Sequence, residues 1–360
     1  MRIALIGEFS GVHQYLAAGL RKLGHTVLVV SDGDGYKNFK RDIDVNGSVN
    51  NKYFNSLNRI VKEILATDRI KNYDVVQFIN PIAFFKYGPL NILYKKIASN
   101  NGKLFLLAAG TDTYFWKAYR NGLYKYSPHE GLLKDKNENK SQWEKKRYIQ
   151  LTDNLISLSV GVIPCIPEYQ IAYSEHPKAR SIIPFPLNLE DIEFKEMFKE
   201  KVLSQKLSFF HGMHKKRYGA KGSVLIDKTM KKLSSKYSAD IDYFSAESIP
   251  FEQYLTIIKN VQIVIDQSHS YSPAMNSLIS MAKGKIVMGG CEDEYMCSMG
   301  ITEPPLINIK PNEKSIISQV EFLLENKKSL RNYALRGRKY VEDNHDYISV
   351  AKKYLNEWGQ

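Results

Sequence analysis

Cysteine is scarce in this sequence, and long apolar runs are missing. The three cysteines, Cys165, Cys291 and Cys297, are odd in number and lack metal-type spacing, which disfavours a disulfide framework and a zinc site. No apolar run approaches the length of about 20 residues that a helix needs to span a bilayer. The chain opens on a strand-like run instead of a basic leader. The loop "GEFSG" at 7–11 spaces its glycines differently from a dinucleotide fingerprint, which disfavours NAD. We therefore expect a cytoplasmic protein that binds neither metal nor NAD.

Positive charge is in excess. With 51 Lys and Arg against 38 Asp and Glu, the net charge is +13. Residues 116–148 hold nine cations and four anions among six Trp and Tyr residues, a mixture that suits an anionic membrane surface or a phosphate-bearing acceptor. A solvated face of a helical insertion is the alternative. The cations form no long tract or nucleic-acid motif, so we expect no nucleic-acid partner.

Apolar runs alternate with helical patterns along the whole chain. A chain of 360 residues exceeds the size at which one core keeps growing, so two domains are expected. Strand patterns lie at 2–8, 25–33, 74–80, 103–109, 160–166, 206–212, 239–246 and 261–267. Helical patterns lie at 11–24, 53–66, 89–99, 143–157, 221–237, 250–260, 313–326 and 329–344. This alternation predicts two α/β domains with parallel, doubly wound sheets.

The expected division follows from two prolines and a restart of the pattern. We expect a first domain over residues 1–185, a linker over 186–204 and a second domain over 205–345. The last helical pattern, 346–360, could return to the first domain.

The pair Ser272-Pro273 follows the strand pattern 261–267 and opens a helix that ends at Gly284. Ser is a preferred N-cap and Pro is favoured at the first helical position, so we expect the helix to begin here. A helix N-terminus beyond the carboxyl end of a strand offers free N–H groups to an anion. A plain capped helix of a βαβ unit is the alternative. The candidate diphosphate cradle comprises Ser272, Met275, Asn276 and Ser277.

A basic loop precedes the first helix of the second domain. In "HGMHKKRYGAKG", residues 211–222, a strand end is followed by several cations and a glycine that opens a helix. Arg217 and Lys221 would contact a diphosphate together with the helix N–H groups. A solvated basic turn is the alternative.

The order of these motifs resembles the C-terminal domain of family-4-like, retaining glycosyltransferases of GT-B architecture. "LISMAKGK" and the N-domain "GTD" at 110–112 add to the resemblance, which covers nearly the whole chain. It implies two Rossmann-like domains facing a cleft, an acceptor-side domain over 1–185 and a nucleotide-sugar-binding domain over 205–345. It also implies transfer of a sugar from a UDP- or GDP-linked donor, without metal or cofactor, to a glycan or lipid-linked acceptor in surface polysaccharide or glycoconjugate synthesis. The protein would then be a metal-independent, hexosyltransferase-like enzyme, cytoplasmic or peripheral at the inner face of the membrane.

The resemblance breaks at two positions where such enzymes carry glutamates that contact the donor sugar and the ribose. Here these positions are Ile279 and Tyr271, and neither supplies a carboxylate. Candidate substitutes are Asp266, Ser272, Asn276, Glu292 and Glu294.

The acceptor-side group is expected from the first domain. Asp112, at the carboxyl end of a strand pattern, is the first candidate for a base or orienting group, and His13 is the second. The Asp-x-Asp in "RDID", 41–44, falls outside a predicted strand end and is disfavoured as a metal motif. Contacts to the donor or acceptor are expected from Gly11, His211, Asp266, Glu292 and Glu294. A non-catalytic nucleotide-sugar or glycan-binding relative and a nucleotide-sugar epimerase of the same fold stay open as alternatives.

Overall fold

The chain forms two compact units. The computed structural model describes residues 1–47, 52–84, 91–129, 142–198, 206–213, 221–249 and 251–359. Unit 1 comprises residues 1–123, 139–188 and 346–360, and unit 2 comprises residues 124–138 and 189–345. The expected division kept residues 1–185 together, whereas the structure places 124–138 with unit 2 and begins the main part of that unit at residue 189. Within the described ranges, no helix is both long enough and apolar enough to span a membrane.

Unit 1 is built on a six-stranded parallel sheet with the strand order β3-β2-β1-β4-β5-β6. This is the order of a doubly wound Rossmann sheet. Its strands are nearly continuous apolar runs because helices cover both faces. The strands are β1 (Arg2–Ile6), β2 (Thr26–Ser31), β3 (Ile43–Asp44), β4 (Val75–Ile79), β5 (Lys103–Ala108) and β6 (Gly161–Pro164).

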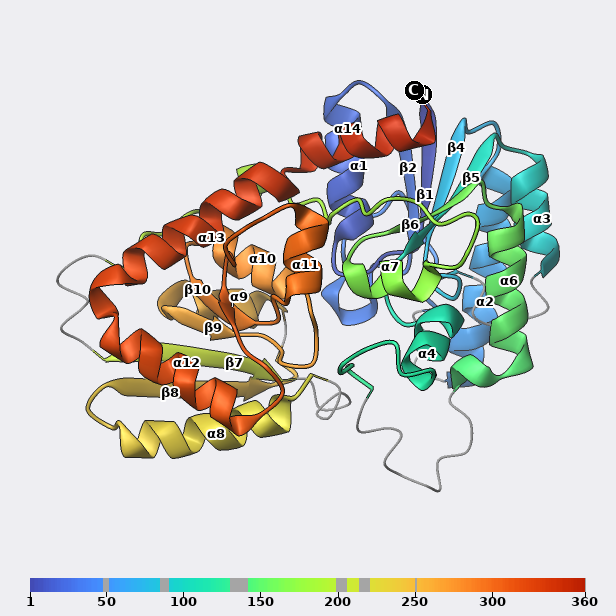
Figure 1. Ribbon diagram of the computed structural model, residues 1–360. Coiled ribbons are helices and arrows are strands. Elements are labelled where there is room, and N and C mark those ends of the chain that lie inside the picture. Colours follow the sequence, from blue (N-terminus) through green and yellow to red (C-terminus); the bar gives the residue numbers. More distant parts are fainter. Residues whose placement is uncertain are drawn as a thin grey trace. The chain divides into compact units, whose positions relative to one another are not determined.

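Helices cover the sheet of unit 1 on both sides, as Figure 1 shows. On one face lie α1 (Val12–Lys22) and the C-terminal α14 (Tyr347–Trp358), and on the other lie α2 (Lys52–Arg69), α3 (Asn91–Ser99) and α6 (Lys146–Leu158). Two further helices follow β5 and β6, α4 (Thr113–Arg120) and α7 (Pro167–Tyr173). Gly19 permits the close packing of α1 and α14, since a Cβ there would lie 2.3 Å from the Tyr347 carbonyl oxygen.

Unit 2 contains a five-stranded parallel sheet in the order β11-β10-β9-β7-β8. Its strands are β7 (Leu207–Met213), β8 (Ile241–Glu247), β9 (Ile263–Ile265), β10 (Ile286–Gly289) and β11 (Ile307–Asn308). Its helices are α8 (Ser223–Lys236), α9 (Phe251–Asn260), α10 (Met275–Ala282), α11 (Asp293–Met299), α12 (Glu313–Glu325) and α13 (Leu330–His345). Side chains of α8, α12 and α13 form the larger core on one face of this sheet, and α9 packs over Phe210 and Val264 on the other.

Candidate functional site

Three ionisable side chains gather where the strands of unit 2 end. His211 lies near the end of β7, Asp266 directly follows β9, and Lys221 stands two residues before α8. The Lys221 ammonium lies 3.5 Å from Asp266 Oδ1. The carboxyl ends of parallel strands form the edge at which open α/β sheets bind ligands. We call His211, Lys221, Asp266 and the first turn of α10 the carboxyl-edge site.

Asp266 organises this site. The residue is buried, and its Oδ1 accepts a hydrogen bond from Asn276 Nδ2 at 3.1 Å while its Oδ2 accepts one from Ser277 Oγ at 2.7 Å. Burial acts to raise the pKa of this carboxyl. The Lys221 charge and the hydrogen bonds from Ser277 and Asn276 outweigh burial and hold the pKa below its ordinary value. Asp266 is therefore a carboxylate at neutral pH.

The side chains of Asn276 and Ser277 have partners within the protein. Both donate to Asp266, although the sequence predicted that they donate to a phosphate. Tyr254 of α9 donates its hydroxyl hydrogen to Asn276 Oδ1, so both ends of this amide are engaged. The two side chains fix the start of α10 against β9, which leaves backbone N–H groups as the anion-binding elements of this turn.

Helix α10 begins at Met275, so the prediction that it begins at Ser272-Pro273 is wrong. The Ser270 hydroxyl donates to the Ser272 carbonyl at 3.1 Å and accepts from the Ser272 N–H at 3.3 Å, which closes a turn before the helix. The N-cap is Ala274, whose side chain has no oxygen to accept a hydrogen bond. The N-cap side chain therefore accepts no hydrogen bond from the first N–H groups of α10. These groups lie at the positive end of the helix dipole.

His211 brings an unpaired acceptor to the carboxyl-edge site. Its ring is fully buried, and Nδ1 lies 2.8 Å from the Ile265 carbonyl oxygen, to which it donates. Nε2 is buried and has no hydrogen-bond partner among the described residues. Burial lowers the pKa of this histidine, so the ring is neutral and Nε2 carries a lone pair. A buried lone pair without a donor favours a ligand hydroxyl or N–H at this place.

Lys221 and Gly222 form the tight entry to α8. Gly222 is the N-cap with φ of 73°, and a Cβ there would lie 2.1 Å from Ser268 Oγ and 2.4 Å from His269 Nδ1. The Ser268 N–H donates to the Lys221 carbonyl at 3.1 Å. The loop before α8 is thereby bound to the loop after β9. Arg217, predicted beside Lys221, lies outside the described residues.

The two glutamates after β10 have partners in unit 2. Glu292 accepts from Asn308 Nδ2 at 2.8 Å through Oε1, and it is buried. Glu294 Oε1 lies 2.6 Å from Lys125 Nζ, whereas Glu294 Oε2 is buried with no hydrogen-bond partner among the described residues. Both glutamates therefore lie beyond the carboxyl end of β10, and Glu294 retains an acceptor that a ligand hydroxyl could use.

Tyr271, at one of the two positions where an expected glutamate is missing, is a buried aromatic side chain. Its hydroxyl oxygen accepts a hydrogen bond from the Lys125 N–H, and its ring meets Tyr124 and Tyr126 edge-on, with centroids 6.3 and 5.2 Å away. These contacts attach the start of segment 124–138 to the rest of unit 2. Ile279, at the other missing glutamate, is also buried.

The basic aromatic segment 116–148 is only partly exposed, and residues 130–141 lie outside the described residues. Trp116 is buried and donates its indole N–H to Glu144 Oε1 at 3.0 Å, and Tyr124 is buried as well. These two aromatics therefore serve packing rather than a surface. The exposed cations of the described part include Lys145, Lys146 and Arg147 at the start of α6.

In unit 1, the loop after β1 encloses two buried ionisable groups. Glu8 accepts from the backbone N–H of Gln14 at 2.8 Å, and burial raises its pKa to about 7. His13 Nδ1 donates to the Gly7 carbonyl at 2.8 Å, and Nε2 lies 3.2 Å from Gln77 Nε2, from which it accepts. Burial lowers the pKa of His13 to about 4, so the ring is neutral. Gly11 is the left-handed N-cap of α1, with φ of 86°.

Asp112 is the N-cap of α4. One carboxylate oxygen accepts from the Phe115 N–H at 2.8 Å, and the other accepts from the Tyr173 hydroxyl at 2.6 Å. The residue is fully buried, and burial raises its pKa to about 6. Both oxygens are engaged inside unit 1, as expected for a group that positions α4 and α7 rather than one that meets a substrate.

Reading the sequence missed Glu8 and Tyr254. Glu8 ends the strand pattern of β1 and stands five residues before His13, so a carboxylate at a strand end was a usable signal. Tyr254 lies on a different helix from its partner Asn276, and no local pattern relates the two.

Solved structures resemble this chain over nearly its full length. Sucrose-phosphate synthase from Thermosynechococcus elongatus has a TM-score of 0.62 at 11% identity, with 99% of this chain and 98% of that one covered. HepE from Anabaena, in complex with UDP and glucose, has a TM-score of 0.61 at 11% identity, with 99% of each chain covered. WaaG, a glycosyltransferase involved in lipopolysaccharide biosynthesis, has a TM-score of 0.55 at 13% identity, with 99% of each chain covered.

The chain has the GT-B type of fold. Both sheets, their helices and the coverage of these structures agree with it, as predicted from the sequence. No family model matches the chain, and no curated protein matches it. The likeness at 10–15% identity thus establishes the α/β architecture with two parallel sheets, and the chemistry depends on the residues of the site.

Proposed function

We propose that this protein is a glycosyltransferase that takes a sugar from a nucleoside-diphosphate sugar. The observation that carries the proposal is the carboxyl-edge site. There an uncapped helix N-terminus, a lysine and an unpaired buried histidine nitrogen occur together. HepE, with the same fold, has been solved with UDP and with UDP-glucose, which supports a uridine donor ahead of a guanosine donor.

In the proposed mechanism, the protein stabilises the leaving diphosphate without a metal. The N–H groups of Met275, Asn276 and Ser277 would donate hydrogen bonds to phosphate oxygens. The ammonium of Lys221 would neutralise negative charge as the sugar–phosphate bond breaks. Arg217 would add a second cation. Asp266 stays an internal group whose hydrogen bonds hold Asn276 and Ser277 so that the backbone of the turn is preorganised.

Other groups would replace the two missing glutamates. His211 Nε2 and Glu294 Oε2 are buried acceptors without partners among the described residues, and hydroxyl groups of a sugar or ribose are donors. We propose that these two atoms orient the donor. Glu292 would act through Asn308, which it already contacts.

Asp112 and His13 were predicted as the acceptor-side base and its substitute. Since both are fully buried and their polar atoms are engaged, we propose instead that they hold the loops of unit 1 in place. Gly11 would allow the backbone of the first loop to approach a ligand, because its left-handed conformation opens α1 without a side chain.

We also propose a glycan or lipid-linked acceptor and binding at an anionic membrane. The exposed Lys145, Lys146 and Arg147 would meet anionic headgroups. Helix α2 gives a second reason to propose membrane binding. Opposite its buried face it carries a stripe of exposed apolar side chains that lipid could cover. The stripe comprises Phe54, Leu57, Val61, Ile64 and Leu65, which are 41–63% exposed.

The experiment is a calorimetric titration of UDP and GDP into wild type and into Lys221→Ala. The variant should lose about 1.5–3 kcal/mol of binding free energy because a hydrogen bond to a charged oxygen is removed. Lys314→Ala, an exposed lysine of α12 in the same unit, is the matched control and should bind as wild type does. Equal affinities of all three proteins would refute the proposed diphosphate contact.

An epimerase is the second candidate, because a putative UDP-N-acetylglucosamine 2-epimerase from Listeria monocytogenes has a TM-score of 0.55 with 99% of this chain covered. Analysis of the products separates the two. A transferase releases free nucleoside diphosphate and a glycosylated acceptor, an epimerase returns an isomerised nucleotide sugar, and a non-catalytic relative does neither.

A further inference from the structure

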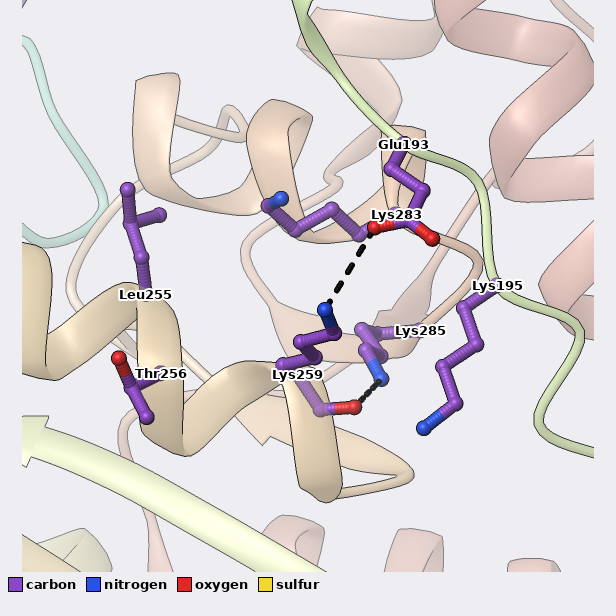
Figure 2. A pocket seen from close by; sticks show the side chains of 7 residues that line it. All are labelled: Glu193, Lys195, Leu255, Thr256, Lys259, Lys283 and Lys285. Carbon is purple, nitrogen blue, oxygen red and sulfur yellow. Dashed lines mark hydrogen bonds and ion pairs between the residues drawn. The ribbon is translucent and has the colours of Figure 1, made fainter.

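Four lysines surround a cavity of unit 2 at the opposite edge of its sheet from the carboxyl-edge site. Lys259 lies near the end of α9 and Lys285 immediately precedes β10, so both stand at the amino ends of strands. Lys283 follows α10, and Lys195 comes from the chain that leads toward β7. Figure 2 shows these side chains around a cavity of about 220 Å³ that Glu193, Leu255 and Thr256 also line.

The charges around this cavity are unbalanced. Glu193 is the only carboxylate that lines it among the described residues, and its Oε2 lies 3.6 Å from Lys259 Nζ. Four lysines against one glutamate leave three positive charges. Like charges in a partly enclosed place repel one another unless an anion lies between them.

Lys285 shows this repulsion most clearly. Its side chain is buried, and the ammonium donates to the Lys259 carbonyl at 3.1 Å, which is the one hydrogen bond it makes in the described part of the chain. Burial, and then the charges of Lys195 and Lys283, lower the pKa of Lys285 to about 8. Burial also lowers the pKa of Lys283. A bound anion would supply acceptors for the two remaining N–H groups of Lys285 and compensate its neighbours.

We propose that this cavity binds a small, soluble, phosphate-bearing polyanion at a site separate from the carboxyl-edge site. Three net positive charges match an anion with two or three negative charges. The concave shape and the volume favour a small molecule over the flat surface of a membrane. The proposal depends on none of the groups assigned to the nucleotide sugar, so it stands or fails independently of the proposed function.

The test uses inorganic pyrophosphate as the probe, titrated calorimetrically into the full chain at low salt with UDP held at saturation. Lys195→Gln and Lys283→Gln should each weaken pyrophosphate binding about tenfold, since each removes a charge-assisted hydrogen bond. Both side chains are at least partly exposed, so these variants are expected to fold. Lys285→Met removes the buried ammonium and should weaken binding at least as much.

Two controls separate this cavity from the other candidate sites. Lys314→Gln, at an exposed lysine outside both sites, should leave pyrophosphate affinity unchanged. Lys221→Ala reports whether pyrophosphate occupies the carboxyl-edge site instead. Loss of affinity in Lys221→Ala alone would assign the pyrophosphate to the carboxyl-edge site and overturn the proposal. Absence of pyrophosphate binding by wild type would overturn it too, and so would wild-type affinity in both Lys195→Gln and Lys283→Gln. A parallel experiment measures binding to vesicles that contain phosphatidic acid. If Lys195→Gln and Lys283→Gln weaken binding to these vesicles but not to pyrophosphate, a soluble ligand is excluded.

Discussion

Glu8, in the loop after β1, and His13, in the first turn of α1, have opposite pKa shifts. Glu8 Oε1 accepts the backbone N–H of His13 at 3.4 Å, and both side chains are buried from water. The pKa of Glu8 is raised to about 7 and that of His13 is lowered to about 4, in both cases mainly because burial penalises the charged form.

The contributions of Glu8 and His13 to the pH dependence of the free energy of unfolding are expected to cancel. Between pH 4.5 and 7, folded Glu8 holds a proton that the unfolded chain has lost, so its contribution to the free energy of unfolding falls as pH rises. Between pH 4 and 6.5, unfolded His13 holds a proton that the folded chain lacks, so its contribution rises with pH. Each slope is on the order of 1 kcal/mol per pH unit, with opposite sign.

Glu8→Gln should therefore make the free energy of unfolding rise with pH, relative to wild type, between about pH 4.5 and 6.5. His13→Gln should make it fall over the same window, and the double variant should return to the wild-type slope. Urea denaturation at three pH values measures all four proteins. Parallel pH profiles would show that neither group changes its protonation on folding.

Gly222 is expected to be irreplaceable. Gly222→Ala adds a Cβ in a left-handed conformation against Ser268 Oγ and His269 Nδ1, so it should destabilise unit 2 by more than about 2 kcal/mol and weaken UDP binding. Gly300→Ala is the matched control, because Gly300 also has positive φ but a Cβ there meets open space. It should cost about 1 kcal/mol and leave UDP affinity unchanged. Equal effects of the two substitutions would contradict the close approach at Gly222.

Asp266→Asn separates an internal role from a ligand contact. The variant loses the partner of Lys221 and weakens the hydrogen bonds to Asn276 and Ser277, so thermal or urea unfolding should show a loss of about 1–3 kcal/mol. UDP affinity should fall less than in Lys221→Ala, because the weaker hydrogen bonds to the first turn of α10 are offset by the removal of a negative charge next to the phosphates. A folded Asp266→Asn protein whose UDP affinity falls as far as that of Lys221→Ala would instead place Asp266 against the donor.

Membrane binding is expected to depend on two surfaces in different ways. Neutralising Lys145, Lys146 and Arg147 with glutamine should abolish the salt-sensitive part of sedimentation with anionic vesicles, since the Debye length falls to about 8 Å near physiological ionic strength. Leu57→Ser with Val61→Ser on α2 should weaken binding at every salt concentration. Leu335→Ser on α13, a partly exposed leucine of unit 2, is the control. A protein that ignores anionic vesicles even at low salt would contradict the membrane proposal.

Most of the secondary structure could be predicted, because strands covered on both faces are continuous apolar runs and amphipathic helices repeat every 3.6 residues. Helix α10 ends at Ala282 with Lys283 as its C-cap, and Gly284, the predicted helix end, follows directly with φ of 78°. The start of α10 was not predicted, because Ser270 and Ser272 close a turn whose hydrogen bonds no helix pattern reveals. The two-residue strands β3 and β11 are too short to show a period.

The site was predicted only in part. Lys221, His211 and Asp266 were located from their places after strands and before a helix, and the structure brings them together. Asn276 and Ser277 donate their hydrogen bonds to Asp266 because that carboxylate is buried beside them. No local sequence pattern predicts this tertiary contact. The attachment of Tyr124 and Lys125 to unit 2 through Tyr271 is likewise set by packing between distant segments.

Amide hydrogen exchange at the start of α10 tests the central claim most directly. Exchange of the N–H groups of Met275, Asn276 and Ser277 is measured for the free protein, with UDP or GDP, and with uridine or guanosine as controls that lack phosphates. The account predicts that a nucleoside diphosphate slows exchange at these amides and that the nucleoside alone does not. Unchanged exchange at these amides while UDP or GDP is bound, or equal protection by the nucleoside, would show that the phosphates lie elsewhere.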